Sequence, residues 1–175
     1  MSGGLAARGA ILLLSLLAAA SPSAAERRAE ASWIRGIFTG HSPRPIEVSD
    51  GEAWQHAQAQ ARAAGDALVL LGSGRSMQPL YPSGTVLVLR PVAYDQLRPG
   101  QTAVYRNQAT KAVAHVLVAR TRDGWRARGL NNPRHDMEPV RPGNLLGVVV
   151  GAYLPTRPAA ARITGSPVFF LADQR

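Results

Sequence analysis

The sequence contains no cysteine. This absence excludes disulfide bonds, thiolate zinc sites, cysteine proteases and lipid attachment through a cysteine thiol. Histidine is also scarce, and His41, His56 and His135 lack partner ligands at metal-binding spacing. We therefore expect neither a metal ion nor a cofactor.

Lysine is nearly absent, because Lys111 is the single one and arginine carries the remaining positive charge. The formal net charge of +9 favours contact with anionic surfaces. The arginines are scattered along the chain, without a basic helix or interleaved aromatic residues. We therefore expect no nucleic-acid partner, whereas contact with a membrane surface stays open.

The apolar run at residues 10–20 is about half as long as the roughly 20 residues that a membrane-spanning helix needs. Arg8 precedes this run and the small residues of 21–25 follow it, which is the layout of a cleavable signal peptide. We predict an exported protein that is periplasmic or attached to the outer face of the cytoplasmic membrane. A retained anchor formed by residues 5–25 is the alternative to cleavage.

A chain of 175 residues suits one compact domain with appendages. We predict a signal peptide or anchor at 1–25, a spacer and an amphipathic helix at 26–65, a β-rich domain at 66–155, and a tail at 156–175. The first part of the spacer is polar and interrupted by prolines, so it is predicted to be poorly structured. Its candidate docking points are Trp33, Ile34 and Phe38.

The predicted helix can be capped by Ser49 or Asp50, and Gly65 ends it. Apolar residues at helical spacing define one face that packs against a sheet. These residues are Ala53, Trp54, Ala57 and Ala61.

Short segments rich in valine and leucine alternate with turn residues from residue 67 onward. They predict strands at 67–71, 85–90, 102–106, 111–120, 125–129 and 145–153. The short links between several of them favour antiparallel neighbours. The predicted fold class is therefore mainly β, antiparallel, with one preceding helix. The tail is predicted to be loose, with residues 168–171 tying it back.

Three polar residues in this β-rich region have the chemistry of a hydrolytic triad. Ser76 lies on a glycine-rich turn after an apolar strand, and His115 interrupts another apolar strand on the same face as Val113 and Leu117. An imidazole can take the proton of a serine hydroxyl, and Asp136 can orient that imidazole. Taken singly, each residue also has an ordinary structural role as a turn, core or capping residue.

Five segments, in order, resemble the type I signal peptidases. Residues 74–88 resemble the Ser-Met-x-Pro box and the strand after it. Residues 100–105 resemble the family's Gly-Asp-x-Val-Val-Phe strand, and residues 113–117 resemble the Val-His-Arg-Val segment of its archaeal and endoplasmic-reticulum branch. Residues 129–136 resemble that branch's Gly-Asp-Asn-Asn box with its trailing aspartate, and residues 146–149 resemble the closing strand.

The resemblance implies that 66–155 is a catalytic domain with the signal peptidase/LexA-like β fold. It implies a serine endopeptidase that cuts extended peptides, including those of preproteins, after small residues. Ser76 is then the nucleophile, His115 the base and Asp136 the acid. The oxyanion and substrate-binding residues are Ser76, Gly74 and Met77, with the Ser76 amide helping to hold the oxyanion.

The sequence also departs from the family pattern. Thr85, Gln101 and Leu130 replace three family aspartates, and Gly74 replaces a frequent small hydroxyl residue. These changes favour the alternative of a catalytically inactive binding or assembly module that keeps the fold. A LexA-type protease that cuts its own linker is a third hypothesis, and the apolar leader and the lack of a helix-turn-helix pattern argue against it.

Overall fold

The structure is a computed structural model that describes residues 32–49, 51–156 and 169–170. Two short strands, β1 (Trp33–Ile34) and β2 (Ile37–Phe38), pair with each other. The helical elements are α2 (Glu52–Ala64) and a turn of 3-10 helix, η1 (Tyr94–Gln96). The other strands are β3 (Ile46–Val48), β4 (Leu68–Leu71), β5 (Val86–Arg90), β6 (Thr102–Arg106), β7 (Ala112–Thr121), β8 (Gly124–Arg128), β9 (Leu145–Pro155) and β10 (Phe169–Phe170).

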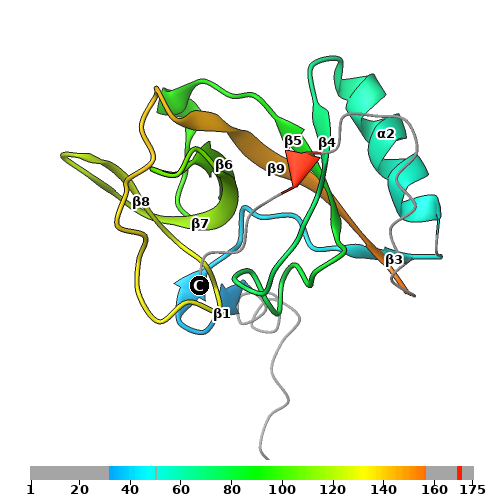
Figure 1. Cartoon of the computed structure of the whole chain (residues 1–175), viewed down its shortest axis with the longest axis horizontal. Coiled ribbons are helices and arrows are strands. Elements are labelled where there is room, and N and C mark those ends of the chain that lie inside the picture. The colour runs from blue at the N-terminus through cyan, green and yellow to red at the C-terminus, as the bar shows by residue number, and fades with distance from the viewer. Residues whose placement is uncertain (1–31, 50, 157–168, 171–175) are drawn as a thin grey trace, which may run out of the picture.

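Eight of these strands form one sheet in the order β10-β4-β5-β9-β6-β7-β8, with β3 beside β9. Figure 1 shows α2 near β4 at one end of the molecule and the β7–β8 hairpin at the other. The pairings are antiparallel except for β3–β9 and β10–β4. The predicted class, mainly β and antiparallel with one preceding helix, is confirmed. All six predicted strands are present, with each end within two residues of the prediction.

Residues 32–48 differ from the predicted unstructured spacer. Ile37 is buried in the core, and β3 runs parallel to β9 through the pair Ile46 and Tyr153. The Tyr81 hydroxyl donates to the Pro43 carbonyl at 2.8 Å. Proline is compatible with an extended segment at a sheet edge, so the prolines do not prevent this packing.

The helix α2 ends as predicted but begins differently. Gly65, at φ 82°, donates its amide to the Ala61 carbonyl at 3.1 Å. At the start, Gly51 is the N-cap and no side chain caps the helix. The Ser49 hydroxyl donates to the Glu52 carboxylate instead of accepting from a helix amide, so the predicted Ser49 cap is wrong. Asp50 lies outside the described residues.

The strand β5 is buried on both faces. Val86 and Val88 pack against α2 through its buried residues, which are Ala53, Ala57 and Ala61. Leu87 and Leu89 point to the other side of the sheet, into a second cluster. Burying each of these side chains contributes roughly 1.5–3 kcal/mol, so β5 anchors both layers of the core.

The segments predicted at the two chain termini lie mostly outside the described residues. The predicted leader at 1–25 and most of the tail at 156–175 are not described. Phe169 and Phe170 pair in parallel with Leu70 and Leu71 at the edge of β4. In the part of the chain that the structure describes, no helix has the length and apolar character needed to cross a membrane.

Register shifts bend the centre of the sheet. The ladder between β6 and β9 shifts between Val104 and Tyr105, and Gly147 of β9 lies opposite Val104 with φ 153°. Such bulges bend a strand and redirect the side chains next to it. Gly147 also lies tightly against β5, because an added Cβ atom would be 2.3 Å from the Arg90 carbonyl oxygen.

Replacing Gly147 with alanine tests this close packing. We expect Gly147→Ala to lower the free energy of unfolding by about 1–3 kcal/mol in urea denaturation, because β9 must move away from β5. Gly143→Ala is the matched control, since an added Cβ atom there meets nothing within 4 Å. Equal stability of the two variants would contradict the packing described.

Candidate active site

Ser76 lies on a tight turn that follows β4. Gly74 adopts φ 91° just before it, a conformation that glycine reaches without a steric penalty. The Gln78 amide donates to the Arg75 carbonyl at 3.1 Å and closes the turn. Ser76 itself is half-buried, so its hydroxyl is fixed in place without being sealed off.

His115 lies in the middle of β7, with 1% of its surface exposed. His115 lies opposite Ala103 of β6, and the pairing of β7 with β8 begins at the next residue, Val116, so the backbone around His115 is held by both neighbouring strands. Val113 and Leu117, on the predicted same face, belong to one buried cluster. The imidazole is therefore a polar group built into a rigid part of the sheet.

Asp136 lies in the irregular segment between β8 and β9. Its amide donates to the Ala127 carbonyl at 2.9 Å. Only 5% of its side chain is exposed, although His135 and Met137 on either side are exposed. The chain therefore turns this carboxylate inward between two outward-facing neighbours.

The three predicted side chains converge. The His115 Nδ1 and Asp136 Oδ2 atoms are 2.7 Å apart, and the His115 Nε2 and Ser76 Oγ atoms are 3.1 Å apart. A carboxylate only accepts, so Nδ1–H donates to Asp136 and leaves Nε2 to accept from the Ser76 hydroxyl. The predicted meeting of these residues is confirmed, and this tautomer is the one that can remove a serine proton.

Sequence reasoning missed Tyr105. Its hydroxyl donates to Asp136 Oδ2, the same oxygen that accepts from His115. Tyr105 is fully buried on β6. The sequence did hold a signal for this bond. Tyr105 lies in a strand whose other inward residues are apolar, and a buried phenol needs a hydrogen-bond partner.

The segment 129–136 does more than supply Asp136. The Asn131 amide donates to the Ser76 carbonyl at 2.7 Å and so holds the serine turn. At Gly129, an added Cβ atom would lie 2.9 Å from His115 Nε2. The glycine therefore leaves room for the imidazole, a requirement that the sequence pattern alone did not reveal.

Thr85, Gln101 and Leu130, which depart from the signal peptidase pattern, have local roles. The Thr85 hydroxyl donates to the Pro82 carbonyl at 2.6 Å. The Gln101 side-chain oxygen accepts from the Arg98 amide at 2.8 Å. Leu130 is buried in the same cluster as Met77. Thr85 and Gln101 thus stabilise turns, and Leu130 fills the core. None of the three disturbs the contacts among Ser76, His115 and Asp136.

A small hollow of about 20 Å³ adjoins Ser76. Gly74 and Met77, which were predicted to take part in substrate binding, both line it. The other lining residues are Gly72, Ser73, Tyr81, Leu87 and Ala114. A space of this size holds about one water molecule, so it fits only a small side chain.

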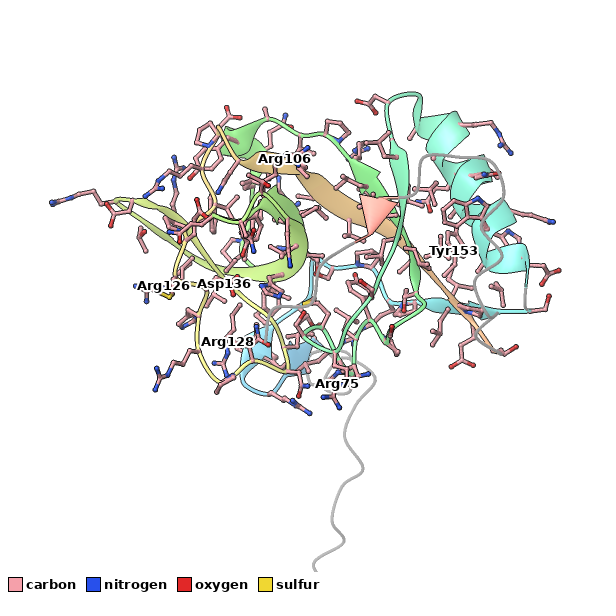
Figure 2. The ribbon with its side chains drawn as sticks, viewed as in Figure 1. Arg75, Arg106, Arg126, Arg128, Asp136 and Tyr153 are labelled. Atoms are coloured by element: carbon pink, nitrogen blue, oxygen red, sulfur yellow. The ribbon has the colours of Figure 1, made fainter. Side chains whose placement is uncertain are left out.

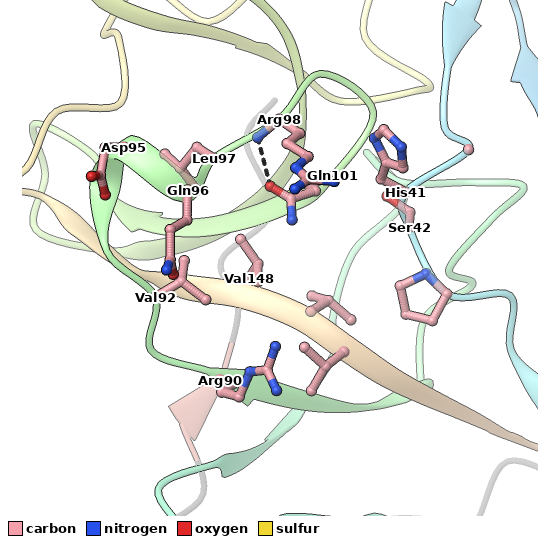
Figure 3. A pocket seen from close by; sticks show the side chains of 14 residues that line it. His41, Ser42, Arg90, Val92, Asp95, Gln96, Leu97, Arg98, Gln101 and Val148 are labelled. Carbon is pink, nitrogen blue, oxygen red and sulfur yellow. Dashed lines mark hydrogen bonds between the residues drawn. The ribbon is translucent and has the colours of Figure 1, made fainter. Parts of the chain in front are cut away.

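A much wider cleft of about 820 Å³ contains none of the three triad residues (Figure 3). It does contain a serine and a histidine, but each is bonded to backbone. The Ser42 hydroxyl donates to the Gly100 carbonyl at 2.8 Å, and His41 Nδ1 is bonded to the Pro99 carbonyl at 2.7 Å. This cleft therefore lacks a nucleophile paired with a base.

Basic side chains gather near the acid. Figure 2 shows Arg126 and Arg128 on the same side of the molecule as Asp136, far from Tyr153. Partial desolvation of this largely exposed residue, followed by the charges of these two arginines, lowers the pKa of His135. Within residues 32–49, 51–156 and 169–170, no cluster of three or more His, Asp or Glu is arranged to hold a metal ion.

Comparison of the chain with protein-family models and with curated proteins gives no match.

Two buried tyrosines give the stability of this region a defined pH dependence. Burial raises the pKa of Tyr81, and burial together with Asp136 raises the pKa of Tyr105. The unfolded chain then loses these protons first, so the free energy of unfolding is at its full value below about pH 10 and falls as the pH rises further.

We expect this fall to reach about 1.4 kcal/mol per pH unit for each tyrosine. Urea denaturation at pH 9, 10 and 11 measures it. In the Tyr105→Phe variant, the free energy of unfolding should fall with pH about half as steeply as in the wild type, because only one of the two buried tyrosines remains. If the free energy of unfolding of Tyr105→Phe fell with pH as steeply as that of the wild type, the raised pKa of Tyr105 would be contradicted.

Proposed function

We propose that this protein is a serine endopeptidase of the signal peptidase I type, which cuts extended peptides after small residues. The observation that carries the proposal is the chain of contacts from Ser76 Oγ to His115 Nε2, at 3.1 Å, and from His115 Nδ1 to Asp136 Oδ2, at 2.7 Å. Both distances are within reach of proton transfer in an unliganded site.

The reaction follows from these contacts. Ser76 Oγ attacks the peptide carbonyl carbon while its proton passes to His115 Nε2. The resulting imidazolium is stabilised by Asp136 and gives the proton to the leaving amine when the C–N bond breaks. A water molecule, deprotonated by the same Nε2, then hydrolyses the acyl-enzyme and releases Ser76.

The proposed oxyanion donor is the Ser76 amide. Among the described residues, this amide is in no backbone–backbone hydrogen bond of a turn or loop, which supports its assignment to the substrate oxygen. Backbone amides aimed at the developing charge are a common source of transition-state stabilisation. The hollow of about 20 Å³ beside Ser76 supports selection of small residues, because a larger side chain would clash there.

The proposed location and substrates rest on the N-terminal sequence and on the resemblance. Residues 10–25 have the layout of an export signal, so we place the enzyme in the periplasm or on the outer face of the cytoplasmic membrane. Its substrates would be peptides and leader-bearing preproteins, with no cofactor required.

The direct test is cleavage of a leader-bearing preprotein by purified protein. We expect Ser76→Ala and His115→Ala each to lower kcat by at least roughly 10³-fold, and the double variant to lose little more, because the two residues act as one unit. Thermal melts check that each variant is folded. Identical cleavage traces for wild type and Ser76→Ala would favour the inactive binding module.

A second test uses Gly129. We expect Gly129→Ala to lower kcat by roughly tenfold or more, because the added methyl group would sit 2.9 Å from His115 Nε2 and push the ring away from Ser76. Gly143→Ala, which has open space around it, is the control for the same change. Full activity of Gly129→Ala would mean that the imidazole is not held as described.

A further inference from the structure

Two donors share one oxygen of Asp136. Oδ2 accepts from His115 Nδ1 at 2.7 Å and also from the Tyr105 hydroxyl. The second bond comes from outside the predicted triad. A carboxylate oxygen has two lone pairs, so it can accept both bonds at once.

The second bond adds a restraint on the Asp136 side chain. The segment that carries it is irregular, and His135 and Met137 on either side are exposed. One backbone bond, from the Asp136 amide to Ala127, fixes the position of the main chain but not the rotation of the carboxylate. The side chain is restrained by His115 and, on the same oxygen, by the Tyr105 hydroxyl.

Tyr105 is itself rigid. It is fully buried, and β6 pairs with β7 on one side and β9 on the other. In the β6–β7 ladder Tyr105 lies opposite Val113, two residues from the pair between Ala103 and His115. The phenol and the imidazole therefore come from adjacent strands, and the bulge at Val104 and Tyr105 redirects the side chain at this point.

The phenol is suited to this role because it stays protonated. Burial, Asp136 and Glu138 all raise the pKa of Tyr105. It therefore remains a neutral donor across the working pH range and does not compete with His115 as a base. A charged donor at this place would instead neutralise the carboxylate that the imidazolium needs.

We infer that Tyr105 is a positioning residue that holds the Asp136 carboxylate in line with His115. The inference rests on the proposed peptidase function, and it concerns a residue outside the triad that acts only through Asp136. Phenylalanine keeps the buried ring of Tyr105 and removes only the hydroxyl, so Tyr105→Phe isolates the bond to Asp136.

The kinetic test compares Tyr105→Phe with Tyr94→Phe on a leader-bearing preprotein. Tyr94 is the matched control, because its hydroxyl donates to the Val140 carbonyl at 3.1 Å and has no contact with the triad. We expect Tyr105→Phe to lower kcat on the order of tenfold with KM unchanged, and Tyr94→Phe to behave as wild type. Wild-type kcat in Tyr105→Phe would overturn the inference.

A double-mutant cycle separates positioning from general destabilisation. In the Asp136→Asn background, Tyr105→Phe should have little further effect on kcat, because its target is already altered. Equal fold-losses in both backgrounds would mean that Tyr105 acts through the fold and not through Asp136, and would overturn the inference.

A third measurement does not depend on activity. In protein labelled with ¹⁵N-histidine, the Nδ1 proton of His115 should exchange with solvent at least roughly tenfold faster in Tyr105→Phe than in wild type or Tyr94→Phe, because the acceptor becomes mobile. Unchanged exchange would overturn the inference. If no variant and no wild-type protein cleaves any preprotein, the proposed function fails, and this exchange rate still decides the role of Tyr105.

Discussion

The candidate site depends on one requirement: both nitrogens of a buried imidazole must be paired with an oxygen. His115 is 1% exposed, and a polar ring in the core is costly unless its nitrogens are paired. Ser76 and Asp136 supply these partners from opposite sides of the ring. The strand, the turn and the irregular segment that carry the three residues must therefore fold against one another for any of them to be satisfied.

A second layer of contacts holds this arrangement. Asn131 binds the Ser76 carbonyl, and the Arg35 guanidinium donates to the Asn131 side chain. Through Arg35, the β1–β2 hairpin is joined to the segment that supplies Asp136. Residues 32–48 thus brace the site as well as covering the core, which is a different role from that of a spacer.

The three departures from the signal peptidase pattern leave the contacts among Ser76, His115 and Asp136 in place. Thr85 and Gln101 make hydrogen bonds within their own turns, so they substitute for local structure more than for chemistry. Leu130 is a core residue in the same buried cluster as Met77, which follows Ser76 in its turn. The contacts from Ser76 to His115 and from His115 to Asp136 therefore need no further acid at these three positions.

Local periodicity and turn residues were enough to predict the six strands and the alanine face of α2 with its end at Gly65. The side-chain chemistry of Ser76, His115 and Asp136, together with the order of the five segments that resemble the signal peptidases, marked these three residues as a set. The pairing of β3 with β9, the bond from Tyr105 to Asp136 and the packing of Leu130 against Met77 became visible only in the folded chain. Each of these joins residues that are far apart in the chain, and a local pattern carries no information about which distant partner a strand edge or a buried polar group will meet.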